Sequence, residues 1–154
     1  MNLPFEIDEQ LYSRMVGFYC KVFGLPPLAS KIYALLVFDF ERKGLSFDDM
    51  VCGLSASKSS VSTSLNILIS NKFIRDINKI DERKRYFVIN ENFLEIRFQE
   101  ILDRIKEEEI LATALIDFQK KNNYKTKHKC SIYIEMLSKN KQNIEQSLKK
   151  LSQE

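Results

Sequence analysis

The spacing of apolar residues changes twice along this chain, and these changes constrain the fold more than any other feature. Over residues 8–71 the spacing is mostly that of amphipathic helices. It then becomes alternating in the segments 73–77 and 85–89, which predicts two strands joined by a charged tip at 78–84. Helical spacing returns at Phe93. The sequence therefore predicts a mainly α-helical fold that carries one small β-hairpin.

Four helices are expected before the hairpin, at about 8–23, 28–43, 47–54 and 58–71. Pro27 suits the first turn of the second helix, and Gly44 suits the position after its end. Ser46 and Asp49 have the spacing of a capping box, and Ser57 is expected to cap the fourth helix. Ser55 stands in the tight turn between the third and fourth helices, where we expect a left-handed backbone that costs roughly 1 kcal/mol.

Two helices are expected after the hairpin, at about 93–118 and 130–151, with a lysine-rich bend at 119–129. Apolar residues of both helices follow a seven-residue repeat, as in a coiled-coil seam. The repeat is interrupted by Glu107–Glu109 and by Lys141, which occupies a seam position. The glutamates are expected to be a solvated helix face.

Composition excludes several classes of protein. A chain of 154 residues with 44% hydrophobic residues can bury a core without disulfides. Its three cysteines form no CxxC pair, and His128 is the single histidine, so we expect no enzyme, no metal site and no cofactor. The N-terminus lacks a signal-peptide pattern and no apolar run is long enough for a membrane helix, which favours a cytoplasmic protein.

The order of elements is that of a winged helix-turn-helix, in which the fourth helix enters a DNA groove. The major groove requires a slim helix face rich in hydrogen-bonding groups. Lys58 and the free N–H groups at the helix start suit a phosphate. The polar positions expected to face outward are Ser59, Ser62, Thr63 and Asn66.

The hairpin has the charge expected of a DNA-binding wing. Residues 57–86 carry seven basic and three acidic side chains, whereas residues 87–121 carry five basic and eight acidic ones. Arg83, Lys84 and Arg85 lie at the tip, where they can meet phosphates or a narrow minor groove. Asp81 is expected to orient one of these arginines.

Several short motifs of this chain are shared with a known family: Gly24-Leu25-Pro26, Ser57-Lys58-Ser59-Ser60-Val61-Ser62, Leu65, Leu68 and Asp81-Glu82-Arg83-Lys84-Arg85-Tyr86. Through these motifs the chain resembles the GbsR branch of MarR-type transcriptional regulators over about residues 8–121. It implies a homodimeric, ligand-responsive repressor that binds double-stranded DNA. The residues expected at the DNA are Ser57, Lys58, Ser59, Ser60, Ser62, Thr63, Asn66, Arg83, Lys84 and Arg85.

The resemblance also implies an effector pocket between the dimerisation helices and the winged helix. Aromatic residues of the first two helices, Phe18, Tyr33 and Phe38, are the candidates for lining it. Choline or betaine is the ligand type that the branch suggests. The expected organisation is a single domain, with an N-terminal helix at 8–23, a winged helix-turn-helix at 24–90 and a helical dimerisation region at 91–154. The expected dimer contacts are Leu11, Met15, Leu137, Ile144, Leu148 and Leu151.

Several other interpretations stay open at this point. The winged helix can serve as a protein-interaction module, in which case acidic side chains should break up its basic face. The aromatic residues of the first two helices are also explained by core packing. Each cysteine is explained as a small buried side chain, and Cys52 is the best candidate for a redox-sensing thiol.

Overall fold

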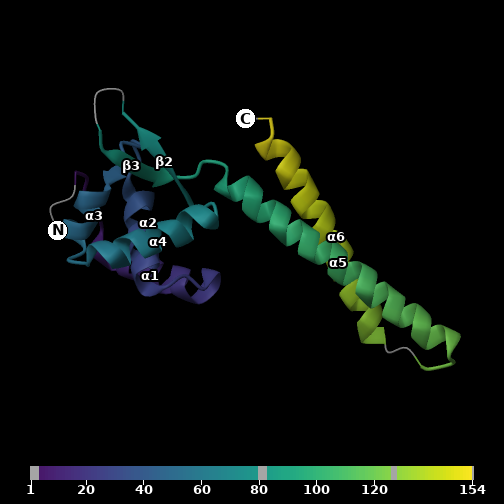
Figure 1. Cartoon of the computed structure of the whole chain (residues 1–154). Coiled ribbons are helices and arrows are strands. Elements are labelled where there is room, and N and C mark those ends of the chain that lie inside the picture. The colour runs from purple at the N-terminus through teal and green to yellow at the C-terminus, as the bar shows by residue number, and fades with distance from the viewer. Residues whose placement is uncertain (1–3, 80–82, 126–127, 154) are drawn as a thin grey trace. The chain divides into compact units, whose positions relative to one another are not determined.

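The structure is a computed structural model that describes residues 4–79, 83–125 and 128–153 (Figure 1). It divides into two compact units, Met1–Glu91 and Asn92–Glu154. The elements are α1 Glu9–Phe23, α2 Pro27–Phe38, β1 Leu45–Ser46, α3 Phe47–Gly53, α4 Lys58–Ser70, β2 Ile74–Asn78, β3 Arg85–Ile89, α5 Phe93–Lys121 and α6 His128–Leu151. This order confirms the predicted fold class. None of these helices, as far as the structure describes them, is long and apolar enough to cross a membrane.

The helix ends of the first unit follow the local signals in the sequence. The Asp8 carboxylate caps α1 by accepting the Leu11 N–H at 2.8 Å. Ser46 and Asp49 form the predicted capping box of α3, and the Ser57 side chain caps α4. These caps confirm three of the predicted helix starts. The starts could be predicted because each cap involves only residues within one helical turn.

The end of α2 was predicted wrongly. The helix stops at Phe38 rather than at residue 43. The buried Asp39 carboxylate accepts the N–H groups of Lys43 and Gly44 at 3.1 and 2.6 Å, and Arg42 has a positive φ of 55°. These bonds fold the chain into a tight loop, which competes with continuation of the helix.

The sheet has three antiparallel strands in the order β1-β3-β2. The hairpin β2–β3 was predicted, whereas β1 was not, because it is two residues long. In β1, Leu45 pairs with Phe87 and Ser46 pairs with Tyr86. Gly44, just before it, has a φ of +78° and lies so close to β3 that a Cβ would meet the Phe87 carbonyl at 3.2 Å. This close approach holds the base of the wing against the start of α3.

The core of the first unit surrounds α2, which is buried on almost every side as the sequence predicted. Val61, Leu65 and Leu68 of α4 are also buried, so one face of that helix is fixed against the core. The remaining buried apolar residues of the unit include Leu25, Ala29, Ile32, Tyr33, Ala34, Leu35, Leu36, Phe38, Leu45, Met50, Phe73, Ile74, Phe87 and Val88.

The second unit is a helical hairpin in which α5 and α6 lie side by side (Figure 1). Leu102 and Ile105 of α5 and Leu137 of α6 are buried within it. The prediction that Leu137 contacts a partner chain therefore needs correction, since its side chain is only 3% exposed in a single chain. Ile144, Leu148 and Leu151 are half-buried in the same hairpin. The seven-residue repeat of α6 thus serves first to pack the helix within its own chain.

Among the described residues, two ion pairs join α5 to α6. Glu109 and Lys141 pair with side-chain exposures of only 19% and 28%, and Lys106 and Glu145 lie 3.6 Å apart. The expectation that Glu107–Glu109 is wholly a solvated face therefore fails for Glu109. Lys141 stands at a seam position because it has an acidic partner on the facing helix.

Replacing Lys141 with alanine is expected to destabilise the chain by about 1–3 kcal/mol, because the largely covered Glu109 carboxylate loses its partner. Urea unfolding followed by circular dichroism measures the change. Lys139→Ala is the matched control, since Lys139 pairs with Glu135 one turn away and both side chains are well exposed. If the two variants lose the same free energy of unfolding, the pair of Glu109 and Lys141 contributes no more to stability than an exposed pair.

Candidate nucleic-acid interface

The outward face of α4 is set by the residues that the helix buries. Because Val61, Leu65 and Leu68 point into the core, helical geometry places Ser59 and Asn66 on the opposite side. Thr63 lies on this same outer side, and Ser62 is displaced from it toward the wing. All four are exposed, as predicted for residues that enter a groove.

The hydroxyl groups at the start and on the outer face of α4 differ in whether they already form hydrogen bonds within the chain. Ser57 Oγ accepts the Ser60 N–H as the helix cap and lies 3.1 Å from Ser59 Oγ and 2.8 Å from Ser60 Oγ. Thr63 Oγ1 donates to the Ser59 carbonyl at 3.0 Å. Within the described residues, the side chain of Asn66 has no hydrogen-bond partner. Its amide, with two donors and an acceptor, is therefore the group on α4 best placed to bond a base edge.

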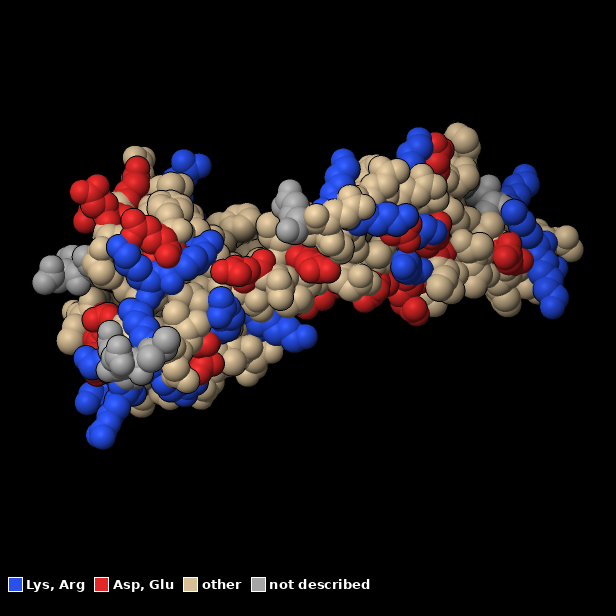
Figure 2. All heavy atoms as spheres, turned by 90° about the horizontal axis from the view of Figure 1, so that it is seen from above, with Lys and Arg blue, Asp and Glu red and all other residues tan. Residues whose placement is uncertain are grey.

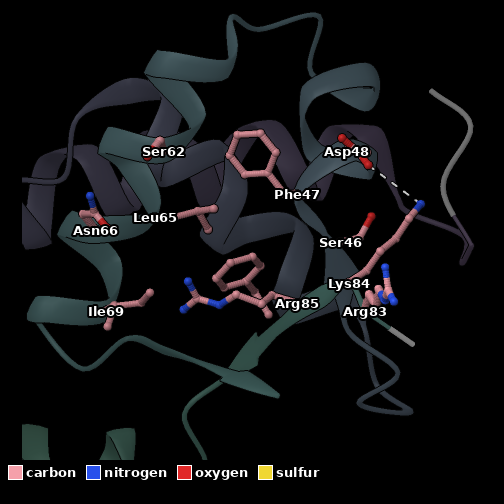
Figure 3. Close-up of a pocket in the computed structure, with 11 residues that line it drawn as sticks. Ser46, Phe47, Asp48, Ser62, Leu65, Asn66, Ile69, Arg83, Lys84 and Arg85 are labelled. Carbon is pink, nitrogen blue, oxygen red and sulfur yellow. Dashed lines mark ion pairs between the residues drawn. The ribbon is translucent and has the colours of Figure 1, made fainter. Parts of the chain in front are cut away.

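A groove of about 470 Å³ separates α4 from the wing (Figure 3). We call it the wing groove. It is lined by Ser46, Phe47, Asp48, Ser62, Leu65, Asn66, Ile69, Arg83, Lys84, Arg85 and Phe87. The structure thus brings two predicted positions of the helix, Ser62 and Asn66, to one groove with all three predicted wing cations.

The three wing cations have different surroundings. Arg85 donates from Nε and Nη2 to one carboxylate oxygen of Asp76, at 3.2 and 2.9 Å, on the neighbouring strand. Lys84 Nζ lies 3.7 Å from the Asp48 carboxylate at the start of α3. Arg83 has no ion pair with any residue that the structure describes. Asp81, predicted to orient an arginine, lies outside the described residues.

The acidic partners of Arg85 and Lys84 were not predicted from the sequence, because they lie on other elements of the fold than the wing cations themselves. Asp76 lies on β2 opposite Phe87, and Asn78 lies opposite Arg85, so the pair of Arg85 with Asp76 is diagonal across the two strands. The sequence could have indicated this pair only if the register of the two strands and the diagonal reach of Arg85 had both been known. Asp48 lies on α3, and nothing local to the wing indicates its position. Lys79 adds a further contact, with its ammonium 3.6 Å from the centre of the Tyr86 ring.

The turn between α3 and α4 has the predicted strain. Ser55 has a φ of 48°, in the left-handed region that normally favours glycine. The Ala56 N–H donates to the Val51 carbonyl at 3.2 Å and closes the turn. The strained backbone allows α4 to leave α3 sharply, with its polar face outward.

The three candidate effector residues differ in environment. Tyr33 and Phe38 are 5% and 7% exposed in the core of the first unit, whereas Phe18 is 52% exposed. The Tyr33 ring packs edge-on against Tyr19 and Phe73, with ring centres 4.8 and 5.0 Å apart. Burial raises the pKa of Tyr33 above its ordinary value. Core packing accounts for two of the three residues, and the effector pocket stays a prediction.

The cysteines and the possible metal ligands are further candidates for a functional site. Cys52 is exposed on α3, and Cys20 and Cys130 are partly buried. Among the described residues no group of three His, Cys, Asp or Glu side chains is close enough to hold a metal ion.

Exposed apolar side chains gather on the helical hairpin. Figure 2 shows broad uncharged areas between the charged residues of α5 and α6. Exposed large apolar residues there are Leu94, Ile110, Leu111, Leu115, Phe118, Ile132, Tyr133 and Met136. On α1, Leu11 is 46% exposed and Met15 is half-buried. Sequence reasoning selected Leu11 and Met15 but missed the exposed residues of α5 and α6, because it assigned the seam to the partner.

The sequence matches no protein-family model and no curated protein. A solved structure described as a transcriptional regulator has a TM-score of 0.58 and 19% identity, covering 95% of this chain and 98% of that chain. A mutant of MepR from S. aureus has a TM-score of 0.45 at 17% identity, covering 75% and 86%. A MarR/EmrR family transcriptional regulator from Acinetobacter sp. ADP1 has 0.42 at 16%, covering 90% and 89%. The first of these similarities shows that the chain shares its fold with a structure described as a transcriptional regulator.

Proposed function

We propose that this chain is a transcriptional regulator of the MarR type that binds specific sites in double-stranded DNA as a homodimer in the cytoplasm. The wing groove is the observation that supports this most directly. It combines an exposed amide on α4, Asn66, with a wing that carries Arg83, Lys84 and Arg85. A helix face for the major groove and a basic hairpin for the backbone are thus parts of one surface.

The two parts have different tasks in this proposal. The α4 face enters the major groove, where Asn66 pairs with an adenine edge and Ser59 makes less selective bonds. Lys58 at the start of α4 and Arg83 at the wing meet phosphates. Arg85, held by Asp76, has a fixed orientation that suits insertion into a narrow minor groove. We call α4 and the β2–β3 wing together the reading head.

A second copy of the chain covers the exposed apolar side chains of α5 and α6 in the second unit, and Leu11 of α1 in the first unit is a separate candidate contact. Soluble monomers rarely expose large apolar surfaces, so an interface between copies is the natural place for these side chains. Dimerisation also supplies two reading heads, which one short recognition helix requires for useful affinity. Control of DNA binding by a small ligand, as in the GbsR branch, belongs to the same proposal.

The alternative is a protein-interaction module with the same fold. It predicts a basic face broken by acidic side chains. Among the described residues of the wing groove, one is acidic, Asp48, and three are basic. This balance favours an anionic polymer as the partner. A chain that binds no duplex at low salt would support the interaction module instead.

Arg83→Ala is expected to weaken binding to operator and scrambled duplexes alike, because phosphate contacts carry no sequence information. The dependence of log K on log salt should become shallower by about one for each reading head. Fluorescence anisotropy at several salt concentrations, on a duplex selected from genomic fragments, measures both quantities. An unchanged salt slope would remove the wing from the DNA interface.

Asn66→Ala is expected to change sequence preference rather than salt dependence. Losing a bidentate contact with adenine should cost roughly 1–3 kcal/mol on the operator and little on a scrambled duplex. The same anisotropy assay measures the ratio of the two affinities. Thr63→Ala is the control on the same face, since its hydroxyl already donates to the Ser59 carbonyl. An unchanged ratio for Asn66→Ala would place the specificity elsewhere on α4 or in DNA shape.

A further inference from the structure

Asp48 is the one carboxylate among the described residues of a groove that otherwise presents positive charge. It lies at the second position of α3 and faces the wing, with Lys84 reaching toward it (Figure 3). The cap of α3 does not use it, because Asp49 bonds both the N–H and the hydroxyl of Ser46, at 2.9 and 2.7 Å. The contact that the structure gives Asp48 is the ion pair with Lys84.

The two carboxylate–cation pairs of the reading head are built differently. Asp76 receives two hydrogen bonds from the planar guanidinium of Arg85, which fixes the direction of that side chain. Lys84 and Asp48 lie 3.7 Å apart, and both side chains are 61% exposed. A lysine ammonium on a flexible stem is oriented only weakly by such a contact. The pair with Asp48 therefore neutralises Lys84 without positioning it.

We infer that Asp48 competes with DNA phosphates for Lys84 and thereby limits the strength of DNA binding by this chain. The inference rests on the proposed function. When duplex DNA enters the groove, a phosphate must replace the Asp48 carboxylate as the partner of Lys84. Every sequence meets this penalty, so Asp48 lowers the affinity for operator and nonspecific duplexes by a similar factor.

The experiment compares wild type with Asp48→Asn in the full-length chain, by fluorescence anisotropy on a duplex selected from a random pool and on a scrambled duplex. Asp48→Asn is expected to strengthen binding to both, by about two- to five-fold for each reading head at low salt. The salt slope should become steeper, because Lys84 then displaces more counterions. The factor should be similar for the two duplexes, because a phosphate contact carries no sequence information.

A double-mutant cycle tests the route through Lys84. In the Lys84→Ala background, Asp48→Asn should lose most of its effect, since the competing cation is absent. Glu41→Gln is the matched control. Glu41 forms an exposed pair with Lys43 and does not line the groove, but its loss changes the net charge by the same amount. A smaller effect for Glu41→Gln than for Asp48→Asn is expected.

Three results would overturn the inference while leaving the proposed function intact. Weaker operator binding by Asp48→Asn would show that Asp48 positions Lys84 or contacts a base. An equal gain from Glu41→Gln would assign the effect to net charge. A gain that persists in the Lys84→Ala background would remove Lys84 from the mechanism. If the wild-type chain binds no duplex even at low salt, the proposed function fails and the inference fails with it.

Discussion

Replacing Leu115 with glutamate is expected to convert the proposed homodimer into a monomer and to lower apparent DNA affinity by about 100-fold or more, because the two half-sites are then bound independently. Leu115 is 60% exposed in the single chain, so the substitution should leave the fold of the monomer nearly unchanged. A charge buried between two copies without a partner is costly, and the interface is lost. Light scattering at micromolar concentration and anisotropy on the operator measure the two effects.

Ala114→Glu serves as the control for the added charge. Ala114 is the exposed neighbour of Leu115 in sequence, and it does not belong to either of the grooves on α5 that Leu115 lines. The Ala114→Glu variant should leave both the oligomeric state and the DNA affinity close to those of wild type. A dimeric Leu115→Glu variant would show that the second copy covers a different face.

Gly44→Ala is expected to destabilise the chain by about 2–4 kcal/mol. Part of the loss is the left-handed backbone at a φ of +78°, which an alanine adopts at a cost of roughly 1–2 kcal/mol. The rest comes from overpacking, because the new Cβ would lie 3.1 Å from the Tyr86 Cβ and 3.2 Å from the Phe87 carbonyl oxygen. Urea unfolding measures the loss, and the salt slope of DNA binding reports on displacement of the wing.

Gly24→Ala isolates the contribution of the contact with β3. Gly24 also has a positive φ, of 64°, but an added Cβ would have nothing within 4 Å. Its replacement should therefore cost only the backbone strain. If the two variants lose the same stability, the close approach of Gly44 to the wing has no energetic weight.

The sequence predicted those features of the fold that depend on neighbouring residues. The capping box of Ser46 and Asp49 and the left-handed turn at Ser55 each involve one helical turn or less. The early end of α2 could not be predicted in this way. It depends on the Asp39 carboxylate reaching forward to Gly44, in a loop whose shape is set by packing against β3.

In the candidate interface, too, features set by neighbouring residues could be predicted, and features set by residues distant in sequence could not. The polar face of α4 follows from its apolar face, so its exposed residues could be selected from the sequence. The pairing of Lys84 with Asp48 joins residues that are distant in sequence, and only the folded chain brings them together. The dimer surface was assigned partly to Leu137 because a seven-residue repeat does not say whether its partner helix belongs to the same chain.

The largely covered ion pair of Glu109 and Lys141 has a consequence for how α5 and α6 are aligned along each other. A regular repeat of apolar residues allows α6 to slide along α5 by one repeat while apolar side chains still meet. The two charges face each other in the observed alignment, and a slide by one repeat would separate them. We therefore expect Lys141 to favour the observed register of the two helices, at the expense of a more apolar seam.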